Sequence, residues 1–151
     1  LQICLQMWSE NDGPYDGKHY QLAETLNSPQ ALSQPHPPIM IGGMGEKKTL
    51  RFVAKYGDAC NLFSVGHEVA AAKLDVLRRH CEAEGTDYDA IAKTILYAGN
   101  DVASGDHDAF VKDMAGYSTL GITEVQVMPW TPDPIGFVNG LVDMVPKLAE
   151  I

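Results

Sequence analysis

The chain has 151 residues, 45% of them hydrophobic, which is enough to build one buried core. Its formal net charge of −9 argues against nucleic acids and anionic membranes as partners, because both bind basic surfaces. No apolar run reaches the roughly 18 residues that a membrane-spanning helix needs. We therefore expect a globular protein whose partner is a small molecule.

The three cysteines, Cys4, Cys60 and Cys81, are scattered and include no CxxC pair. An odd number at such spacing does not predict a disulfide framework. A reducing compartment suits free thiols best, so we expect a cytoplasmic protein.

The first 37 residues precede the regular part of the chain. Residues 1–8 have the pattern of a helix, and a chain that opens at Leu1 inside a helix is expected to be a piece of a longer protein. Asp16-Gly17 between aromatic residues predicts a hairpin over residues 15–20. Residues 28–38 hold four prolines and are expected to form an extended loop.

The remainder alternates between strand and helix patterns four times. Strands are predicted near residues 39–41, 59–63, 94–99 and 124–128, each followed by a helical pattern. Such alternation indicates parallel strands with helical crossovers. Two α/β architectures fit: an open doubly wound sheet, which periodicity alone favours, or half of a TIM (β/α)8 barrel, since a whole barrel needs about 250 residues.

The helices are predicted from their apolar stripes and their caps. After the first strand, Leu50, Val53 and Ala54 share one face, and Gly57 ends the pattern. The next helix, over residues 68–84, has a stripe of Ala70, Leu74, Leu77 and Cys81, and Gly85 ends it. Ser104 or Asp106 is expected to cap a helix that passes through Phe110, Met114 and Leu120 and ends at Gly121.

The last helix is expected to begin at Asp133-Pro134, a capping residue followed by a first-turn proline. Its buried face would be Phe137, Leu141, Met144 and Leu148. Pro146 is expected to kink or fray its final turn.

The clearest chemical signal is the turn Gly42-Gly43-Met44-Gly45 between a strand and a helix. Glycines let a backbone approach an anion closely, and a helix start offers unpaired N–H groups. We expect the N–H groups of Gly43, Met44 and Gly45 to face a phosphate-bearing ligand. The turn matches neither GxGxxG nor the P-loop, and a tight turn without a ligand is the alternative interpretation.

Other polar residues point to no particular chemistry. The five histidines lack metal-ligand spacing, so no metal site is predicted. No G-x-S-x-G motif supports a catalytic serine. Asp101 follows the third strand of the regular part, where barrels carry their chemistry, although loop aspartates more often form turns or caps.

The segment from Pro37 to Phe63 resembles the luciferase-like family, and most closely its F420-dependent oxidoreductases; the most specific part of the resemblance is the passage His-Pro-Pro-Ile-Met-Ile-Gly-Gly, residues 36–43. Residues 14–22 and 120–127 are also similar to that group. The resemblance implies a TIM barrel of which residues 38–151 form the last four βα units, preceded by a helix, a hairpin insertion and a Pro-rich loop in residues 1–37. The chain would be a single domain, the C-terminal half of the barrel.

The resemblance also implies a cofactor and a site. Coenzyme F420 would be the cofactor, with FMN as the alternative. Five positions are implied to contact it: Ile41, Gly42, Gly43, Met44 and Gly45. Asn61, Phe63 and Trp130, at the ends of later strands, are candidates for the substrate pocket. The family's catalytic groups belong to the early strands, so none is identified in this chain.

The predicted activity is that of an oxidoreductase that moves a hydride between F420 and an organic substrate. The alternatives are an FMN-dependent monooxygenase of the same superfamily and a non-catalytic half-barrel that binds a cofactor or assembles with another chain. Exposed strand edges favour pairing, either with a second copy or with the missing N-terminal half. We expect Ile39, Ile41, Ile95, Val125 and Val127 to face the barrel interior.

Overall fold

The fold is described from a computed structural model of residues 1–151, which describes every residue apart from the side chain of Asn100. The chain divides into two compact units, Leu1–Ile39 and Met40–Ile151. That the whole chain forms a single domain stays a prediction.

The first unit contains the predicted helix and hairpin. Helix α1 spans Gln2–Met7, and strands β1 (Tyr15–Asp16) and β2 (Gln21–Leu22) pair in antiparallel orientation. The Gln6 amide links α1 to the segments on either side of the hairpin, because its Nε2 donates to the buried Thr25 hydroxyl at 3.0 Å and to the Gly13 carbonyl at 3.2 Å. The proline-rich stretch after the hairpin forms neither helix nor strand, as predicted.

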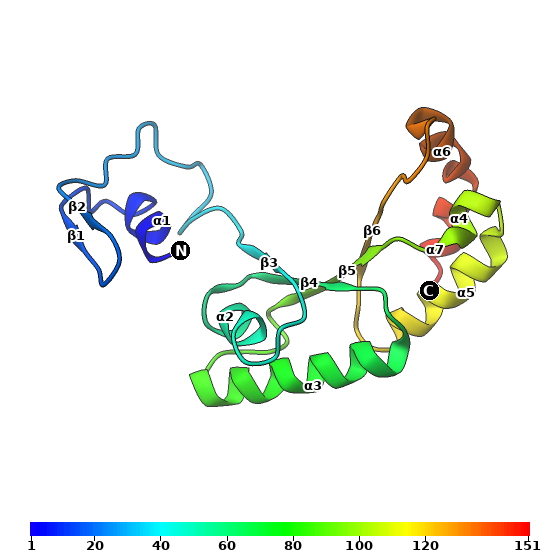
Figure 1. Ribbon diagram of the computed structural model, residues 1–151, viewed down its shortest axis with the longest axis horizontal. Helices are drawn as coiled ribbons and strands as arrows, with labels where there is room; N and C mark the ends of the chain where they lie inside the picture. Colours follow the sequence, from blue (N-terminus) through cyan, green and yellow to red (C-terminus); the bar gives the residue numbers. More distant parts are fainter. The chain divides into compact units, whose positions relative to one another are not determined.

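The second unit is built on a four-stranded parallel sheet. Its strands are β3 (Met40–Gly42), β4 (Ala59–Phe63), β5 (Ala92–Tyr97) and β6 (Glu124–Val127). They lie side by side in chain order, without the reversal that a doubly wound sheet requires (Figure 1). The predicted α/β fold with sequential βα units, as in half of a barrel, is therefore confirmed.

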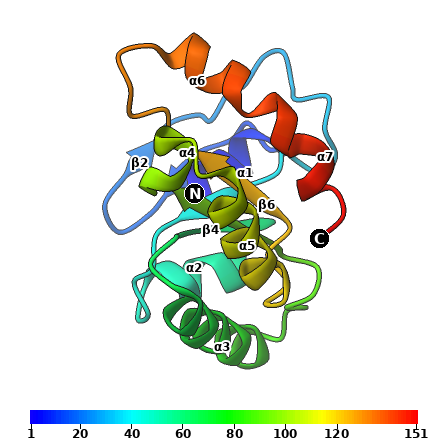
Figure 2. The same ribbon diagram turned by 90° about the vertical axis from the view of Figure 1, so that its right-hand side faces the viewer.

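Three helices cover one face of this sheet: α2 (Thr49–Tyr56), α3 (His67–Glu84) and α5 (His107–Ser118). The stripes predicted for α2 and α3 are the residues that these helices bury. They pack with Cys60, Leu62 and Ile95 of the strands into one core, and α2 and α3 lie next to each other (Figure 2). Helix α3 ends at Gly85, whose φ of 72° is left-handed and suits glycine.

The connection after β5 differs from its prediction. A short helix, α4 (Asn100–Ser104), precedes α5 and was not predicted. Ser104 belongs to α4, whereas Asp106 caps α5 by accepting a hydrogen bond from Ala109 N at 3.1 Å. Helix α5 ends at Ser118, although the sequence pattern predicted that it continues through Leu120 and ends at Gly121.

The last helix is broken into three pieces. Helix α6 (Pro134–Gly140), a 3-10 turn (Val142–Met144) and α7 (Val145–Leu148) replace the single predicted helix. The predicted cap is confirmed, since the Asp133 carboxylate accepts from Gly136 N at 2.9 Å. The chain leaves α-helical geometry just before Pro146, which has no N–H to continue the pattern.

The prediction of the inward-facing side chains was wrong. Ile95 is fully buried in the helix-covered core, and Ile41, Val125 and Val127 pack against that core. Successive residues of a strand point to opposite faces of the sheet, so the residues that alternate with these apolar ones lie on the face away from the helices. This second face, away from the helices, carries Met40, Gly42, Asn61, Phe63, Thr94, Leu96, Glu124 and Gln126.

In the described part of the chain, no helix combines the length and the apolar character that crossing a membrane requires.

Candidate functional site

The strand ends bring the predicted site residues to one edge of the sheet. The four strands are parallel, so their carboxyl ends meet at that edge, where barrel enzymes carry their chemistry. The glycine turn begins at Gly42, the last residue of β3, Phe63 ends β4, and Trp130 lies three residues beyond the end of β6. Asn61 lies within β4, opposite Gly42 in the register.

Gly43 has a conformation that only glycine adopts easily, with a φ of 117°. Its N–H donates to the Asn61 carbonyl at 2.9 Å, which extends the ladder between β3 and β4. This amide is therefore used within the protein, contrary to the expectation that it faces a ligand. Among the described residues, the N–H groups of Met44 and Gly45 meet no acceptor, so their role in anion binding stays a prediction.

The helix expected directly after the glycines begins later. Helix α2 starts at Thr49, and a turn over residues 46–48 separates it from Gly45. Lys48 precedes the helix with φ −121° and ψ −56°, which are not helical. The partial positive charge of α2 therefore lies beyond the glycine turn, and the turn's own amides are the nearer donors.

Two contacts of Glu46, in the turn over residues 46–48, attach this part of the chain to α3. The Lys73 ammonium donates to the Glu46 carboxylate at 2.5 Å, and His80 Nε2 donates to the Glu46 carbonyl at 2.7 Å. The hydrogen bond and charge of Lys73 lower the pKa of Glu46, so this carboxyl stays ionised at neutral pH. The side chain of Met44 packs against the core. The Met44 side chain and the neighbouring Glu46 are thus held in place by contacts that leave the Met44 and Gly45 amides unused.

Gly42 leaves room on the second face. A Cβ built at this position would have the Asn61 carbonyl, at 4.0 Å, as its nearest neighbour. Its φ is not positive, so the backbone does not require glycine there. The missing side chain leaves space beside Asn61, as a site for a closely approaching ligand requires.

Asn61 belongs to a chain of hydrogen-bonded polar side chains on the second face. Its Nδ2 donates to Gln126 Oε1, and Gln126 Nε2 donates to Glu124 Oε1. The sequence analysis did not identify Gln126 and Glu124 as site residues. Their alternation, Glu124-x-Gln126, places both on one face of a strand and could have indicated them.

Phe63 and Trp130 expose much of their rings. Phe63 is 50% and Trp130 71% exposed, and both lie at the carboxyl-end edge. Exposed aromatic rings at a strand edge are suited to contact a flat ligand. Their assignment to a substrate pocket stays a prediction.

Asp101 is occupied by a structural contact. The Tyr97 hydroxyl donates to the Asp101 carboxylate at 2.8 Å, and the ring packs edge-on against Phe110 at 5.0 Å. Burial, and then the hydrogen bond to Asp101, raise the pKa of Tyr97 well above its ordinary value. The pair joins the end of β5 to α4.

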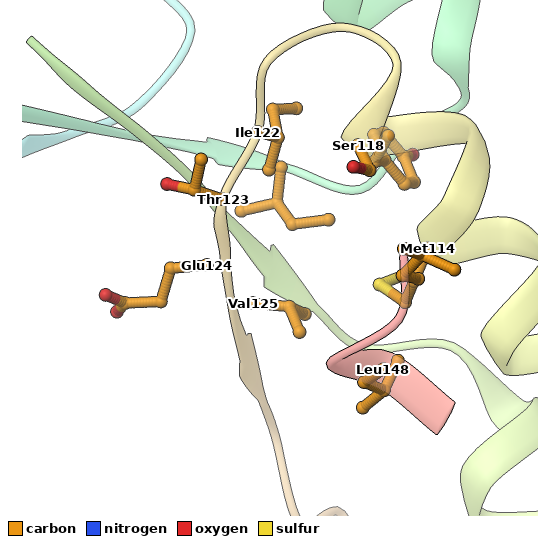
Figure 3. Close-up of a pocket in the computed structure, with 10 residues that line it drawn as sticks. Met114, Ser118, Ile122, Thr123, Glu124, Val125 and Leu148 are labelled. Carbon is orange, nitrogen blue, oxygen red and sulfur yellow. The ribbon is translucent and has the colours of Figure 1, made fainter. Parts of the chain in front are cut away.

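A pocket of about 250 Å³ lies elsewhere, between β6, α5 and the C-terminal segment. It adjoins the start of β6 at Ile122, Thr123 and Glu124, which is the amino end of the strand. Figure 3 shows Val125 and Glu124 on opposite sides of β6, with Val125 on the side of Leu148. Its position at the amino end separates it from the glycine turn.

The chain belongs to the luciferase-like monooxygenase family, whose sequence profile matches residues 1–129. The family consists of oxidoreductases with a barrel fold, and the four parallel strands in chain order agree with part of such a barrel. Among curated proteins, no sequence matches the chain.

Solved structures share the fold. An F420-dependent secondary alcohol dehydrogenase in complex with an F420–acetone adduct has a TM-score of 0.77 at 12% identity, over 95% of this chain and 58% of that one. The monooxygenase RslO1 from Streptomyces bottropensis has a TM-score of 0.64 at 15% identity, over 97% and 57%. A long-chain alkane monooxygenase (LadA) has 0.50 at 17%, over 80% and 35%. The chain therefore spans less than two thirds of each of these proteins.

Proposed function

We propose that this chain forms the cofactor-tail side of an oxidoreductase that transfers a hydride between coenzyme F420 and an organic substrate. The observation that carries the proposal is the glycine turn at the end of β3, which has unused amides at Met44 and Gly45, leaves free space at Gly42 and is followed directly by Glu46, which is bonded to α3. Membership in the luciferase-like family and the fold of an F420-dependent dehydrogenase support it.

The residues of the turn fit an anionic tail. The N–H groups of Met44 and Gly45 would donate to phosphate oxygens, and the exposed Lys47 and Lys48 add positive charge close by. Gly42 would let the ligand approach the backbone. Ile41 would contribute only through its backbone, because its side chain packs against the core.

When bound, the reduced deazaflavin supplies the hydride. The protein's task is to bind and orient the ring and to exclude water, for which the exposed rings of Phe63 and Trp130 are suited. We assign proton-transfer groups to the part of the enzyme that this chain does not contain, so the chain alone is not expected to be active.

Cofactor titration of the full-length protein tests the proposal. Binding of F420 should be tighter than binding of FMN, because the longer anionic tail makes more contacts with the turn. Hydride transfer should proceed without oxygen consumption. Tighter binding of FMN, or substrate oxidation coupled to oxygen uptake, would contradict the F420 assignment.

An FMN-dependent monooxygenase is the second candidate function. The name of the matching family favours it, and two of the similar structures are monooxygenases. In that case FMN would occupy the same turn, and activity would require oxygen.

A non-catalytic half-barrel that binds a cofactor or assembles with another chain is the third candidate. The two edge strands favour it, because β3 pairs only with β4, and β6 only with β5, within the described residues. Such a chain would bind F420 or FMN without turnover, even when combined with its partner chain.

A further inference from the structure

The pocket beside β6 has walls from several elements of the second unit. Ile95 and Val125 belong to the sheet, Met114 and Tyr117 to α5, and Leu148 to α7 (Figure 3). Its volume is about 250 Å³, and a cavity of about 150 Å³ is enough to bind benzene in a protein core. The pocket is therefore large enough for a small ring, and every residue that lines it belongs to the second unit.

The walls of this pocket are held by contacts made outside it. Ile95, Met114 and Tyr117 are almost fully buried. The Tyr117 hydroxyl accepts a hydrogen bond from Gly66 N at 3.0 Å, and the Tyr117 ring packs edge-on against the His67 ring at 4.5 Å. Turning the Tyr117 ring into the pocket would break both contacts. The space is thus formed by the fold itself and does not need a ligand to open it.

The charges around the pocket favour an uncharged ligand. Among the described residues, no Lys, Arg or His side chain lines it, so a carboxylate inside would lack a counter-ion. The Glu124 side chain lies on the opposite side of β6 from Val125 (Figure 3), so a cation inside would have no carboxylate beside it. Because burying an unpaired charge is costly, the pocket selects against ions of either sign.

One hydroxyl at the pocket is available for a hydrogen bond. Ser118, at the end of α5, is partly buried, and its hydroxyl bonds to none of the described residues, whereas the neighbouring Thr119 hydroxyl donates to the Gly116 carbonyl at 2.7 Å. Every buried side-chain polar atom in this part of the chain has a partner, so the Ser118 hydroxyl is open to the pocket or to solvent. A serine hydroxyl both donates and accepts, which suits an alcohol, a phenol or a ketone.

We propose that this pocket is a binding site for a small neutral molecule with an apolar ring and one hydroxyl or carbonyl group, which hydrogen-bonds to Ser118. Mostly apolar walls with a single well-placed polar group are typical of small-molecule sites. The pocket lies at the amino end of β6, whereas the glycine turn begins at the carboxyl end of β3. The inference therefore goes beyond the proposed function and does not rest on it.

Phenol and benzene test the site, because they share a ring and differ by one hydroxyl. The full-length protein, with isotope-labelled methionine methyl groups, is titrated with each probe and followed by NMR. Each probe should shift the Met114 methyl in a saturable way, because its ring would lie against that side chain. The Met44 methyl, which belongs to the glycine turn, should not move and is the internal control. Met114→Leu identifies the Met114 signal.

Two substitutions on β6 form a matched pair. Val125 and Val127 are partly buried side chains that pack against the core from the same face of the same strand, but of the two only Val125 lines the pocket. Val125→Phe should abolish the shift by filling the space, whereas Val127→Phe should retain it.

Ser118→Ala tests the hydrogen bond separately from the apolar walls. It should weaken phenol binding by about five- to tenfold, the weight of one hydrogen bond, and leave benzene binding unchanged. An equal effect on both probes would show that the hydroxyl does not recognise the ligand.

Three results would overturn the site itself. They are no saturable Met114 shift with either probe, an equal shift of the Met44 methyl, and binding retained in a folded Val125→Phe. The first would mean that another part of the full-length protein fills the pocket. If thermal unfolding shows that Val125→Phe does not fold, the comparison of the two probes in Ser118→Ala decides. F420 and FMN take no part in these titrations, so failure of the cofactor assignment would leave this site unaffected.

Discussion

Gly42 and Gly43 are neighbours in the chain, yet a side chain would affect them differently. At Gly42 the protein itself has space for a Cβ, whereas Gly43 combines a φ of 117° with a Thr49 methyl 3.3 Å from its Cβ position. Replacing Gly43 would therefore disturb both the fold and any ligand. Gly42 is the position at which ligand binding can be tested separately.

We predict that Gly42→Val weakens F420 binding by about tenfold, or roughly 1.4 kcal/mol, without loss of thermal stability. The new side chain would fill the space beside Asn61 and keep a ligand from the backbone. Gly43→Val should weaken binding as well, but should also lower the unfolding midpoint. Gly66→Ala, at another positive φ of 102° with open space around it, measures the backbone strain alone. Unchanged affinity in a folded Gly42→Val would leave only a tight turn without a ligand.

Tyr97 gives a prediction for the pH dependence of stability. Its pKa in the folded protein is raised above the ordinary value of 10, first by burial and then by the hydrogen bond to Asp101. Below pH 10 the phenol is neutral in both states, so its stabilising contribution is complete. Above pH 10 it ionises in the unfolded chain first, and stability falls as pH rises.

Urea unfolding of the wild type and of Tyr97→Phe between pH 8 and about 11 tests this expectation. The wild-type free energy of unfolding should decline more steeply above pH 10 than that of Tyr97→Phe. Tyr20→Phe, which changes a phenol that is 66% exposed, is the matched control. Parallel curves for the wild type and Tyr97→Phe would contradict the raised pKa.

At the scale of elements, the start of α5 distinguishes two capping candidates. Asp106→Ala should lower the free energy of unfolding by about 1 kcal/mol, because the Ala109 N–H loses its acceptor. Ser104→Ala should change it by less than about 0.5 kcal/mol, since the Ser104 hydroxyl donates only to the exposed end of α4. Equal losses in chemical denaturation of the two variants would show that the cap is not specific.

Sequence patterns predicted the elements whose signals are long or repeated. The stripe of α3 recurs at four positions along the helix, so its buried residues could be identified individually. Helix α4 has only five residues, too few for a stripe to repeat. The sequence predicted one continuous last helix with a kink at Pro146. The helical spacing of its apolar residues continues across the 3-10 turn, so the spacing gave no sign of that turn.

The strand faces show why the site was predicted only in part. Alternation showed that Val125 and Val127 share a face, but not which face the helices cover. In this sheet the helices cover the more apolar face, so the polar Asn61 and Gln126 lie on the other. The hydrogen bond between them joins strands 65 residues apart, and no local pattern contains that information.

At the scale of the whole molecule, the parallel sheet has two unpaired edges and a second face that is partly apolar. Met40 is 48% and Phe63 50% exposed. In a closed barrel the interior is filled by side chains from alternate strands around the ring, and no edges remain. The chain spans only 58% of the F420-dependent dehydrogenase that shares its fold.

We therefore predict that the 151-residue chain by itself pairs with a second copy or with a chain that supplies the N-terminal half-barrel. Burying an apolar side chain of the size of Met or Phe stabilises by roughly 1.5 to 3 kcal/mol, a large share of a typical stability of about 5 to 15 kcal/mol. Unpaired N–H and C=O groups along β3 and β6 favour the same outcome.

Sedimentation at micromolar concentration should show a dimer or larger species, and addition of the N-terminal half should replace it with a one-to-one complex of higher thermal stability. F420 turnover, followed by absorbance, should be absent for the chain alone and appear only in that complex. A stable monomer would contradict the pairing argument, and turnover by the chain alone would place the catalytic groups among its own residues.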